Sequence, residues 1–353
     1  MTADRWSRKR TDEWAIEAGW LVGCNFTPSS AGNQLEMWQS ETFDPSTIDR
    51  ELSWAAGLGM NTIRVYLHDL LFEADGQAFL ERIDVVLDIA DGHGIRMIPV
   101  LFDGVWRPSP RLGRQPEPVQ RLHNSIWLQS PGSRKLFDPS SWPTLLPYVS
   151  AVLTRFGDDQ RVLAWDLFNE PDQMDATTLK AGSRDEKSAA ATALLDTVFD
   201  WARDIDPCQP LTTGIWEYGT DHIPLASELN TLTLDRSDII TFHCYEPRVA
   251  LIEVIDALSV HGRPLVCTEW LARTVGSTVG LLDVFSSRQV GAINWGLVDG
   301  RTQTRFPWRS WTEPVDDSEP WFHELLRADG SPYDPEEAAT FRSLTGMSRR
   351  AAP

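Results

Sequence analysis

Two glutamates in this 353-residue sequence each lie at the end of a short apolar run with strand-like composition. Glu170 follows the run Val162–Phe168, and Glu269 lies near the end of the run Leu265–Trp270. Two carboxyl groups held close together can divide acid–base and nucleophilic work, because one can stay protonated while the other is ionised. A single glutamate after a strand is usually a solvated loop residue, so the chemistry depends on a scaffold that brings the pair together.

That scaffold is predicted from a repeated alternation of strand-like and helix-like segments. Apolar positions three and four residues apart, such as Phe79, Ile83 and Val86, predict amphipathic helices between the strands. Eight strand–helix units predict parallel pairing with right-handed crossovers, so we predict an α/β fold, a single-domain (β/α)8 TIM barrel over residues 1–353. The predicted strands are Trp20–Phe26, Thr62–Leu67, Arg96–Phe102, Val162–Phe168, Leu211–Trp216, Ile239–Tyr245, Leu265–Trp270 and Ala292–Leu297.

An open, doubly wound sheet is the alternative, but no Gly-rich phosphate-binding loop follows any strand. Three segments lie outside the alternation. Residues 1–18 are predicted to be an N-terminal extension before the first strand. Residues 103–147 and 299–320 are long and irregular, and they contain three and two tryptophans respectively, which favours ordered loops over disorder. Each follows a barrel strand, so we expect both to be active-site loops with the single domain as their support.

The barrel prediction places the two glutamates at the ends of strands four and seven. These strands lie nearly opposite each other, so Glu170 and Glu269 would face each other across the barrel mouth. This is the geometry for cleaving a glycosidic bond, with one carboxyl group as proton donor and the other as nucleophile.

Asn169-Glu170-Pro171 ending strand four, with Glu269 ending strand seven, resembles the retaining glycoside hydrolases of clan A, and family 5, the cellulase family, in particular. The resemblance extends from the first strand to the final helix. It implies that Glu170 is the acid/base and Glu269 the nucleophile of a double displacement. It also implies that Asn169 binds the sugar 2-hydroxyl, that Arg64 keeps the nucleophile ionised, that His243 and Tyr245 form the His-x-Tyr pair of strand six, and that Trp295 forms the floor beneath the non-reducing sugar.

The sequence departs from the family pattern at the end of strand three, where the family often has a histidine. Here Asp103 stands at that point, and we expect Asp103 to take this place or His123 to reach in from the long loop. A flat indole matches the apolar face of a sugar ring, although loop packing is the alternative for each tryptophan. The other candidates for substrate contact, all on strand ends or the following loops, are Trp38, Trp106, Trp270 and Glu217.

Composition restricts the partners of the protein. The chain has 51 Asp and Glu against 32 Lys and Arg, a formal net charge of -19, which disfavours nucleic acid and anionic membrane surfaces as partners. A neutral carbohydrate is compatible with this charge. His68-Asp69 lacks the partner histidines of a barrel metal site, and the chain has no Gly-x-Ser-x-Gly motif. We therefore expect neither a metal nor a cofactor.

These observations together predict a retaining β-glycosidase that acts on β-glycosides or short oligosaccharides. Two alternatives stay open, namely an endo-β-1,4-glycanase of the cellulase, xylanase or mannanase type, and a carbohydrate-binding barrel without catalysis. We favour exo action because the two long loops can close one end of a cleft. No apolar segment follows the basic residues near the N-terminus, so a cytoplasmic location is expected, and a secreted one if a leader had been trimmed.

Overall fold

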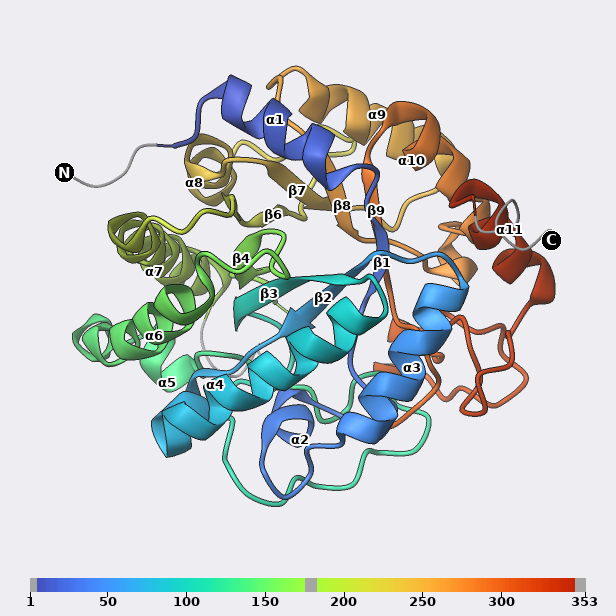
Figure 1. Ribbon diagram of the computed structural model, residues 1–353, viewed down its shortest axis with the longest axis horizontal. Helices are drawn as coiled ribbons and strands as arrows, with labels where there is room; N and C mark the ends of the chain where they lie inside the picture. Colours follow the sequence, from blue (N-terminus) through green and yellow to red (C-terminus); the bar gives the residue numbers. More distant parts are fainter. Residues whose placement is uncertain (1–4, 175–182, 347–353) are drawn as a thin grey trace.

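The computed structural model describes residues 5–174 and 183–346, where parallel strands form a barrel surrounded by helices (Figure 1). The strand order is β5-β4-β3-β2-β1-β9-β8-β7-β6, and every pairing is parallel. This confirms the predicted (β/α)8 TIM barrel. The strands are β1 (Val22–Asn25), β2 (Thr62–Tyr66), β3 (Arg96–Asp103), β4 (Trp165–Asn169), β5 (Leu211–Thr212), β6 (Gly214–Ile215), β7 (Ile240–His243), β8 (Leu265–Glu269) and β9 (Gly291–Trp295).

The fifth predicted strand, Leu211–Trp216, is divided into β5 and β6. β5 pairs with β4 and β6 pairs with β7, so the two short strands together close the barrel. A Cβ atom at Gly214 would lie 3.1 Å from Nε2 of His243, tighter than ordinary van der Waals contact. The missing side chain therefore lets the His243 ring pack against this strand at the barrel mouth.

Helices begin where the sequence provides capping groups. The Asp44 side chain accepts a hydrogen bond from the Thr47 amide, and Pro45 occupies the first turn of α3. The apolar face predicted from Phe79, Ile83 and Val86 is buried in α4, and α7 and α9 likewise bury an apolar face. The helices are α1 (Arg8–Ala18), α2 (Gln34–Trp38), α3 (Pro45–Gly57), α4 (Asp69–Gly92), α5 (Ser133–Leu136), α6 (Leu146–Phe156), α7 (Arg184–Ile205), α8 (Glu228–Arg236), α9 (Arg248–Ser259), α10 (Leu282–Arg288) and α11 (Pro335–Leu344), with 3-10 turns η1 (Pro139–Thr144), η2 (Arg273–Val275), η3 (Val279–Leu281) and η4 (Trp308–Trp311).

Helix α1 covers the amino-terminal end of the barrel. Trp14 Nε1 donates a hydrogen bond to the Leu163 carbonyl at 3.0 Å, and its ring packs against an apolar cluster of residues such as Ile239 at the strand starts. The predicted extension over residues 1–18 thus takes part in barrel packing, apart from residues 1–4, which lie outside the described residues.

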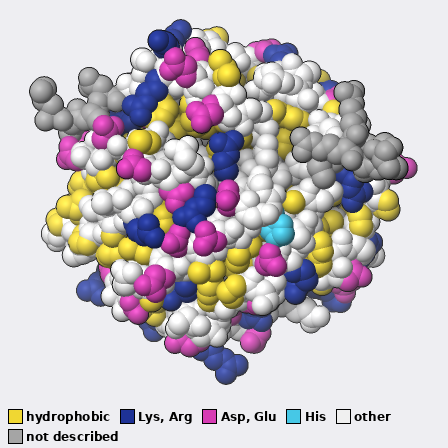
Figure 2. Space-filling view, in the orientation of Figure 1, with side chains coloured by type: hydrophobic (Ala, Val, Ile, Leu, Met, Phe, Trp, Pro, Cys, Tyr) yellow, Lys and Arg dark blue, Asp and Glu magenta, His cyan; other side chains and the backbone are white. Residues whose placement is uncertain are grey.

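Charged side chains of both signs lie on the surface of the molecule (Figure 2). Figure 2 shows acidic and basic side chains interspersed across one face of the molecule. Among the residues that the structure describes, none of the helices is both long and apolar enough to cross a bilayer.

Candidate active site

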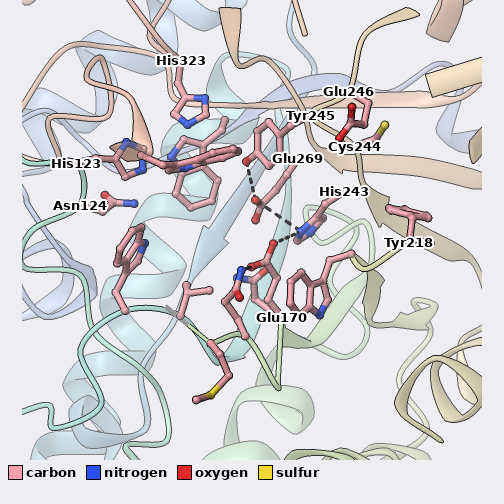
Figure 3. A pocket seen from close by; sticks show the side chains of 18 residues that line it. His123, Asn124, Glu170, Tyr218, His243, Cys244, Tyr245, Glu246, Glu269 and His323 are labelled. Atoms are coloured by element: carbon pink, nitrogen blue, oxygen red, sulfur yellow. Dashed lines mark hydrogen bonds and ion pairs between the residues drawn. The ribbon is translucent and has the colours of Figure 1, made fainter. Parts of the chain in front are cut away.

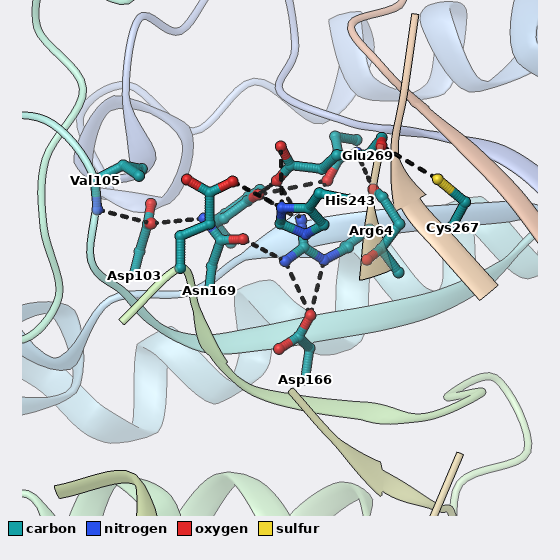
Figure 4. Close-up of polar contacts among 12 residues, drawn as sticks. Arg64, Asp103, Val105, Asp166, Asn169, His243, Cys267 and Glu269 are labelled. Atoms are coloured by element: carbon teal, nitrogen blue, oxygen red, sulfur yellow. Dashed lines mark hydrogen bonds and ion pairs between the residues drawn. The ribbon is translucent and has the colours of Figure 1, made fainter. Parts of the chain in front are cut away.

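Glu269 is the last residue of β8, and three donors hold its carboxylate (Figure 4). Arg64 Nη1 donates to Oε1 at 3.0 Å, and the Tyr66 hydroxyl donates to the same oxygen at 2.9 Å. The Tyr245 hydroxyl donates to Oε2 at 2.8 Å. Hydrogen bonds to an ionised acceptor are stronger than neutral ones and fix the orientation of the carboxylate. The Glu269 carboxylate is therefore held in a fixed orientation at the barrel mouth.

Arg64 on β2 organises the floor beneath this carboxylate. The guanidinium is fully buried between two acids, with Nη2 2.9 Å from Asp166 Oδ2 and Nη1 3.0 Å from Glu269 Oε1. It also donates from Nη2 to Asn169 Oδ1 at 2.7 Å, and from Nη1 to Asn25 Oδ1 at 2.8 Å. Removing one partner of a buried ion pair costs about 3–5 kcal/mol, so Asp166 and Glu269 both depend strongly on Arg64. The network fixes the Asn169 amide relative to Glu269.

Glu170 directly follows β4, in a left-handed backbone conformation with φ of 39°. Such a φ is strained for a non-glycine residue, and strain of this kind gathers at functional sites. His243 Nδ1 lies 2.7 Å from Oε1, and Gln173 Nε2 donates to Oε2 at 3.2 Å. Burial raises the pKa of Glu170, the His243 hydrogen bond lowers it, and the charge of Glu269 raises it, with a net upward result. Glu170 is thus the carboxyl group of the pair suited to carry a proton.

The two carboxyl groups approach closely. One oxygen of Glu170, one oxygen of Glu269 and a ring nitrogen of His243 all lie within 4.8 Å of one another. His243 Nδ1 lies between the acids, 2.7 Å from Glu170 Oε1 and 3.6 Å from Glu269 Oε2. Three such groups can in principle hold a metal ion, but the Arg64 guanidinium already bonded to Glu269 disfavours a cation at the same carboxylate.

A pocket of about 410 Å³ opens above these groups (Figure 3). In this view Glu170 and Glu269 lie between His123 and Asn124 at one end and Tyr218 at the other. The lining residues are Val105, Trp106, His123, Asn124, Asn169, Glu170, Gln173, Met174, Trp216, Tyr218, His243, Cys244, Tyr245, Glu246, Glu269, Trp295, Trp308 and His323.

The two long loops are joined to each other along the end that holds His123. The Trp106 and Trp311 rings are stacked with centroids 5.0 Å apart. Trp311 Nε1 donates to the His123 carbonyl at 2.8 Å, and the His123 amide donates to Ser310 Oγ at 3.1 Å. Because segments 103–147 and 299–320 bond to each other here, they form a continuous wall at this end of the pocket.

The structure brings most of the predicted site residues together around the two glutamates. Asn169, His243 and Tyr245 line the pocket and bond to other site groups. Trp295, at the end of β9, lines the pocket and packs edge-on against Tyr66 and Trp127. The other predicted residues found at the site are Arg64, beneath the pocket, and Trp106 and His123, in its wall.

Two predicted tryptophans do not reach the pocket, and their predicted substrate contact is wrong. Trp270 is fully buried against Phe285 and Phe341, because it follows Glu269 and successive side chains alternate between the two faces of a strand. Glu269 faces the mouth, so Trp270 faces the surrounding helices. Trp38 is also fully buried; its Nε1 donates to the Tyr66 carbonyl at 2.8 Å.

Two predicted acidic residues also lie outside the pocket lining. Glu217 turns away and pairs with Arg184 at 2.6 Å, whereas the preceding Trp216 lines the pocket. Asp103 lies beneath the site, where it accepts hydrogen bonds from Asn169 Nδ2 at 2.9 Å and Trp127 Nε1 at 2.6 Å. Burial raises the pKa of Asp103 to about 7. Asp103 therefore supports the Asn169 amide from below.

Sequence reasoning missed several residues that the structure brings to the site. Tyr66 is two positions after Arg64 on β2, so strand alternation alone predicts that both face the barrel interior. His323 comes from an irregular segment after β9 and carries no comparable signal.

A (β/α)8 barrel with two close glutamates at the carboxyl ends of its fourth and seventh barrel strands defines the class as a barrel-type glycoside hydrolase. The model of the cellulase family, glycosyl hydrolase family 5, matches residues 23–300. The chain belongs to glycosyl hydrolase family 5, which confirms the resemblance drawn from its strand-end motifs.

Relatives of known sequence or structure agree with this family. The probable mannan endo-1,4-β-mannosidase A-2 of Aspergillus terreus is 24% identical over 176 residues, which is 47% of this chain and 40% of that protein. GH5_18 from Streptomyces cattleya, solved in complex with GlcNAc, has a TM-score of 0.61 and 15% identity, covering 95% of this chain and 82% of that chain. An exo-β-1,4-mannosidase from Opitutaceae bacterium strain TAV5 has a TM-score of 0.60 and 18% identity, and the match covers 94% of this chain and 60% of that chain. These structural matches establish the shared fold.

Proposed function

We propose that this protein is a retaining β-glycosidase that removes terminal sugars from β-glycosides or short β-linked oligosaccharides. The observation that carries the proposal is that one carboxyl oxygen of Glu170 and one of Glu269 lie within 4.8 Å of each other. Carboxyl groups about 5–5.5 Å apart support retention, whereas inverting enzymes need about 6.5–9.5 Å to admit a water molecule.

The contacts of each acid support a division of labour. In the first step a Glu269 oxygen bonds to the anomeric carbon while the glycosidic C–O bond breaks, and Glu170 gives its proton to the leaving oxygen. In the second step Glu170 accepts a proton from water, and that water displaces Glu269 from the sugar. Arg64, Tyr66 and Tyr245 orient the nucleophile, and Asn169 is placed to bond the 2-hydroxyl.

The wall at one end of the pocket supports exo action. The terminal sugar would lie between Glu269 and the floor formed by Trp295. The wall that includes Trp106, His123 and Trp308 lies at the same end of the pocket. The leaving group departs beside Glu170, where Gln173 and Trp216 line the opposite end. A chain that continues beyond the terminal sugar would meet the wall.

One relative is a probable mannan endo-1,4-β-mannosidase and another is an exo-β-1,4-mannosidase, so β-mannosides are the first substrates to test, ahead of β-glucosides. The test compares 4-nitrophenyl β-mannoside, a β-1,4-mannose ladder and soluble mannan at equal concentrations of terminal residues. The proposal expects release of single sugars from chain ends, with polymer cleaved no faster per chain end than disaccharide. A rapid fall in polymer length with mixed oligosaccharide products would instead establish the endo-mannanase alternative.

A further inference from the structure

Two buried histidines, His123 and His323, lie at the closed end of the pocket, and each ring bonds through Nδ1 to a backbone carbonyl oxygen. Nδ1 of His123 lies 2.8 Å from the Phe306 carbonyl oxygen, and Nδ1 of His323 contacts the Leu271 carbonyl oxygen. A carbonyl oxygen only accepts hydrogen bonds, so each Nδ1 carries the proton. In the neutral ring Nε2 is then a bare acceptor.

The surroundings keep both rings neutral. Trp308, Phe322 and Tyr245 pack around His323, with ring centroids 5.7, 4.2 and 5.6 Å away. Burial lowers the pKa of His123 to about 4, and burial also lowers the pKa of His323 well below its ordinary value. Two uncharged rings 5.3 Å apart are therefore present at neutral pH.

Neither Nε2 atom has a hydrogen-bond partner among the described residues. Nε2 of His323 is buried and unpaired, which is costly for a polar atom unless a ligand or water bonds to it. Among the described residues, the side-chain hydrogen bond of His123 is made through Nδ1, and none is made through Nε2. Both residues line the pocket, and Figure 3 shows the two rings at the end near Asn124.

We propose that His123 and His323 are specificity-determining residues that accept hydrogen bonds from hydroxyl groups of an uncharged terminal sugar. The inference rests on the proposed function and adds to it a glycone class. Hydroxyl groups are donors and match the two Nε2 lone pairs. An acidic glycone, such as a uronic acid, would bring a carboxylate toward them, and no Lys or Arg stands among the described lining residues to compensate it.

The test combines His→Asn variants with modified substrates. In His123→Asn and His323→Asn the side-chain amide can keep the donation to the backbone carbonyl, but the Nε2 acceptor is lost. The probes are 4-nitrophenyl β-mannoside and β-glucoside, their 3-, 4- and 6-deoxy analogues, and the β-glucuronide. The control is His93→Asn. His93 pairs with Asp49 and does not line the pocket.

On the better parent glycoside, each pocket variant is expected to lose about tenfold in kcat/KM, with the control unchanged. In the wild-type protein, removal of a single sugar hydroxyl should lower kcat/KM about tenfold for at least two of the deoxy analogues. In each pocket variant, one of these two decreases in kcat/KM should shrink to less than about twofold. Unchanged deoxy penalties in both folded variants overturn the proposal.

The wild-type protein alone provides a second measurement if a variant fails to fold. The proposal requires the β-glucuronide to be cleaved at least about 100-fold less efficiently than the β-glucoside. Comparable rates on the two substrates overturn it. If the folded wild-type protein cleaves none of these glycosides, the proposed function itself fails. If it cleaves them through Glu269 without any coupling to the histidines, only the present inference fails.

Discussion

Glu170 and Glu269 approach each other across the barrel mouth so that an oxygen of each lies within 4.8 Å of the other. Their surroundings differ. Glu269 accepts hydrogen bonds from a guanidinium and two hydroxyl groups, whereas Glu170 is buried beside His243 with a raised pKa. The partners of these two acids thus suit them to different roles, because burial favours the protonated form of Glu170 while three donors orient the Glu269 carboxylate.

Replacing Glu269 by alanine removes the nucleophile and is expected to lower kcat on aryl β-glycosides by roughly 10³-fold or more. The space left by the carboxylate should admit a small anion. Added azide or formate should therefore restore part of the activity, with an α-linked glycosyl product detected by NMR. Full activity in the unassisted variant would remove Glu269 from the mechanism.

Replacing Glu170 by glutamine removes the proton donor. Substrates with poor leaving groups should lose the most, because activated aryl groups depart without protonation. In the wild-type protein, kcat/KM should fall as the pH rises through the pKa of Glu170, and the raised pKa moves this fall above the ordinary value of 4.5.

The alkaline fall should be absent in Glu170→Gln when an activated substrate is used. Glu217→Gln is the matched control, since Glu217 pairs with Arg184 outside the pocket, and its profile should keep the fall. If kcat/KM of Glu170→Gln still fell with rising pH as in the wild-type protein, another group would be responsible for the fall.

Tyr66 and Tyr245 bond to different oxygens of Glu269, so their removal can be compared directly. Each Tyr→Phe variant deletes one hydrogen bond to a charged acceptor, which is worth about 1.5–3 kcal/mol. We expect kcat/KM to fall by about 10- to 100-fold in each variant, with unchanged thermal stability within a few degrees. Wild-type kinetics in Tyr66→Phe would limit Tyr66 to a packing role.

Glu324 provides a test of stability rather than activity. It is buried below Gly296, and burial raises its pKa from 4.5 to about 8. Below about pH 4 the folded and unfolded states both hold the proton. Between about pH 4.5 and 8 only the folded state keeps it, so the free energy of unfolding falls as the pH rises.

Glu324→Gln removes this titration while retaining a group that can contact Thr304. The free energy of unfolding should rise by about 1–3 kcal/mol at pH 9 and change little at pH 4, as measured by urea denaturation. Glu253→Gln is the surface control, and its effect on the free energy of unfolding should be the same at pH 4 and at pH 9. A gain at pH 4 as large as that at pH 9 would show that the carboxyl group is not the cause.

The barrel and its two glutamates were predictable because both depend on local patterns. Seven of the eight predicted runs each gave one strand, and parallel pairing places the strand ends at Asn169 and Glu269 on the same face of the barrel. Strand alternation, applied more strictly, would also have excluded Trp270 and included Tyr66. The division of Leu211–Trp216 into two strands follows from closure of the barrel, which no local pattern encodes.

The closed end of the pocket was less predictable. His323 lies in an irregular segment without apolar periodicity, and its position depends on contacts with Leu271 and with the Trp308 ring. Trp38 and Trp106 both lie near strand-end loops in the sequence, but only Trp106 faces the pocket. Tertiary packing alone distinguishes them.

Retention of anomeric configuration is the central claim, and the stereochemistry of the first product tests it most directly. Hydrolysis of a good aryl β-glycoside substrate is followed by proton NMR from the first turnovers, before the released sugar equilibrates in water. Glu170 and Glu269 at their observed separation predict that the β-anomer appears first and the α-anomer follows by slow mutarotation. Initial appearance of the α-anomer would contradict the double displacement and the nucleophilic role of Glu269.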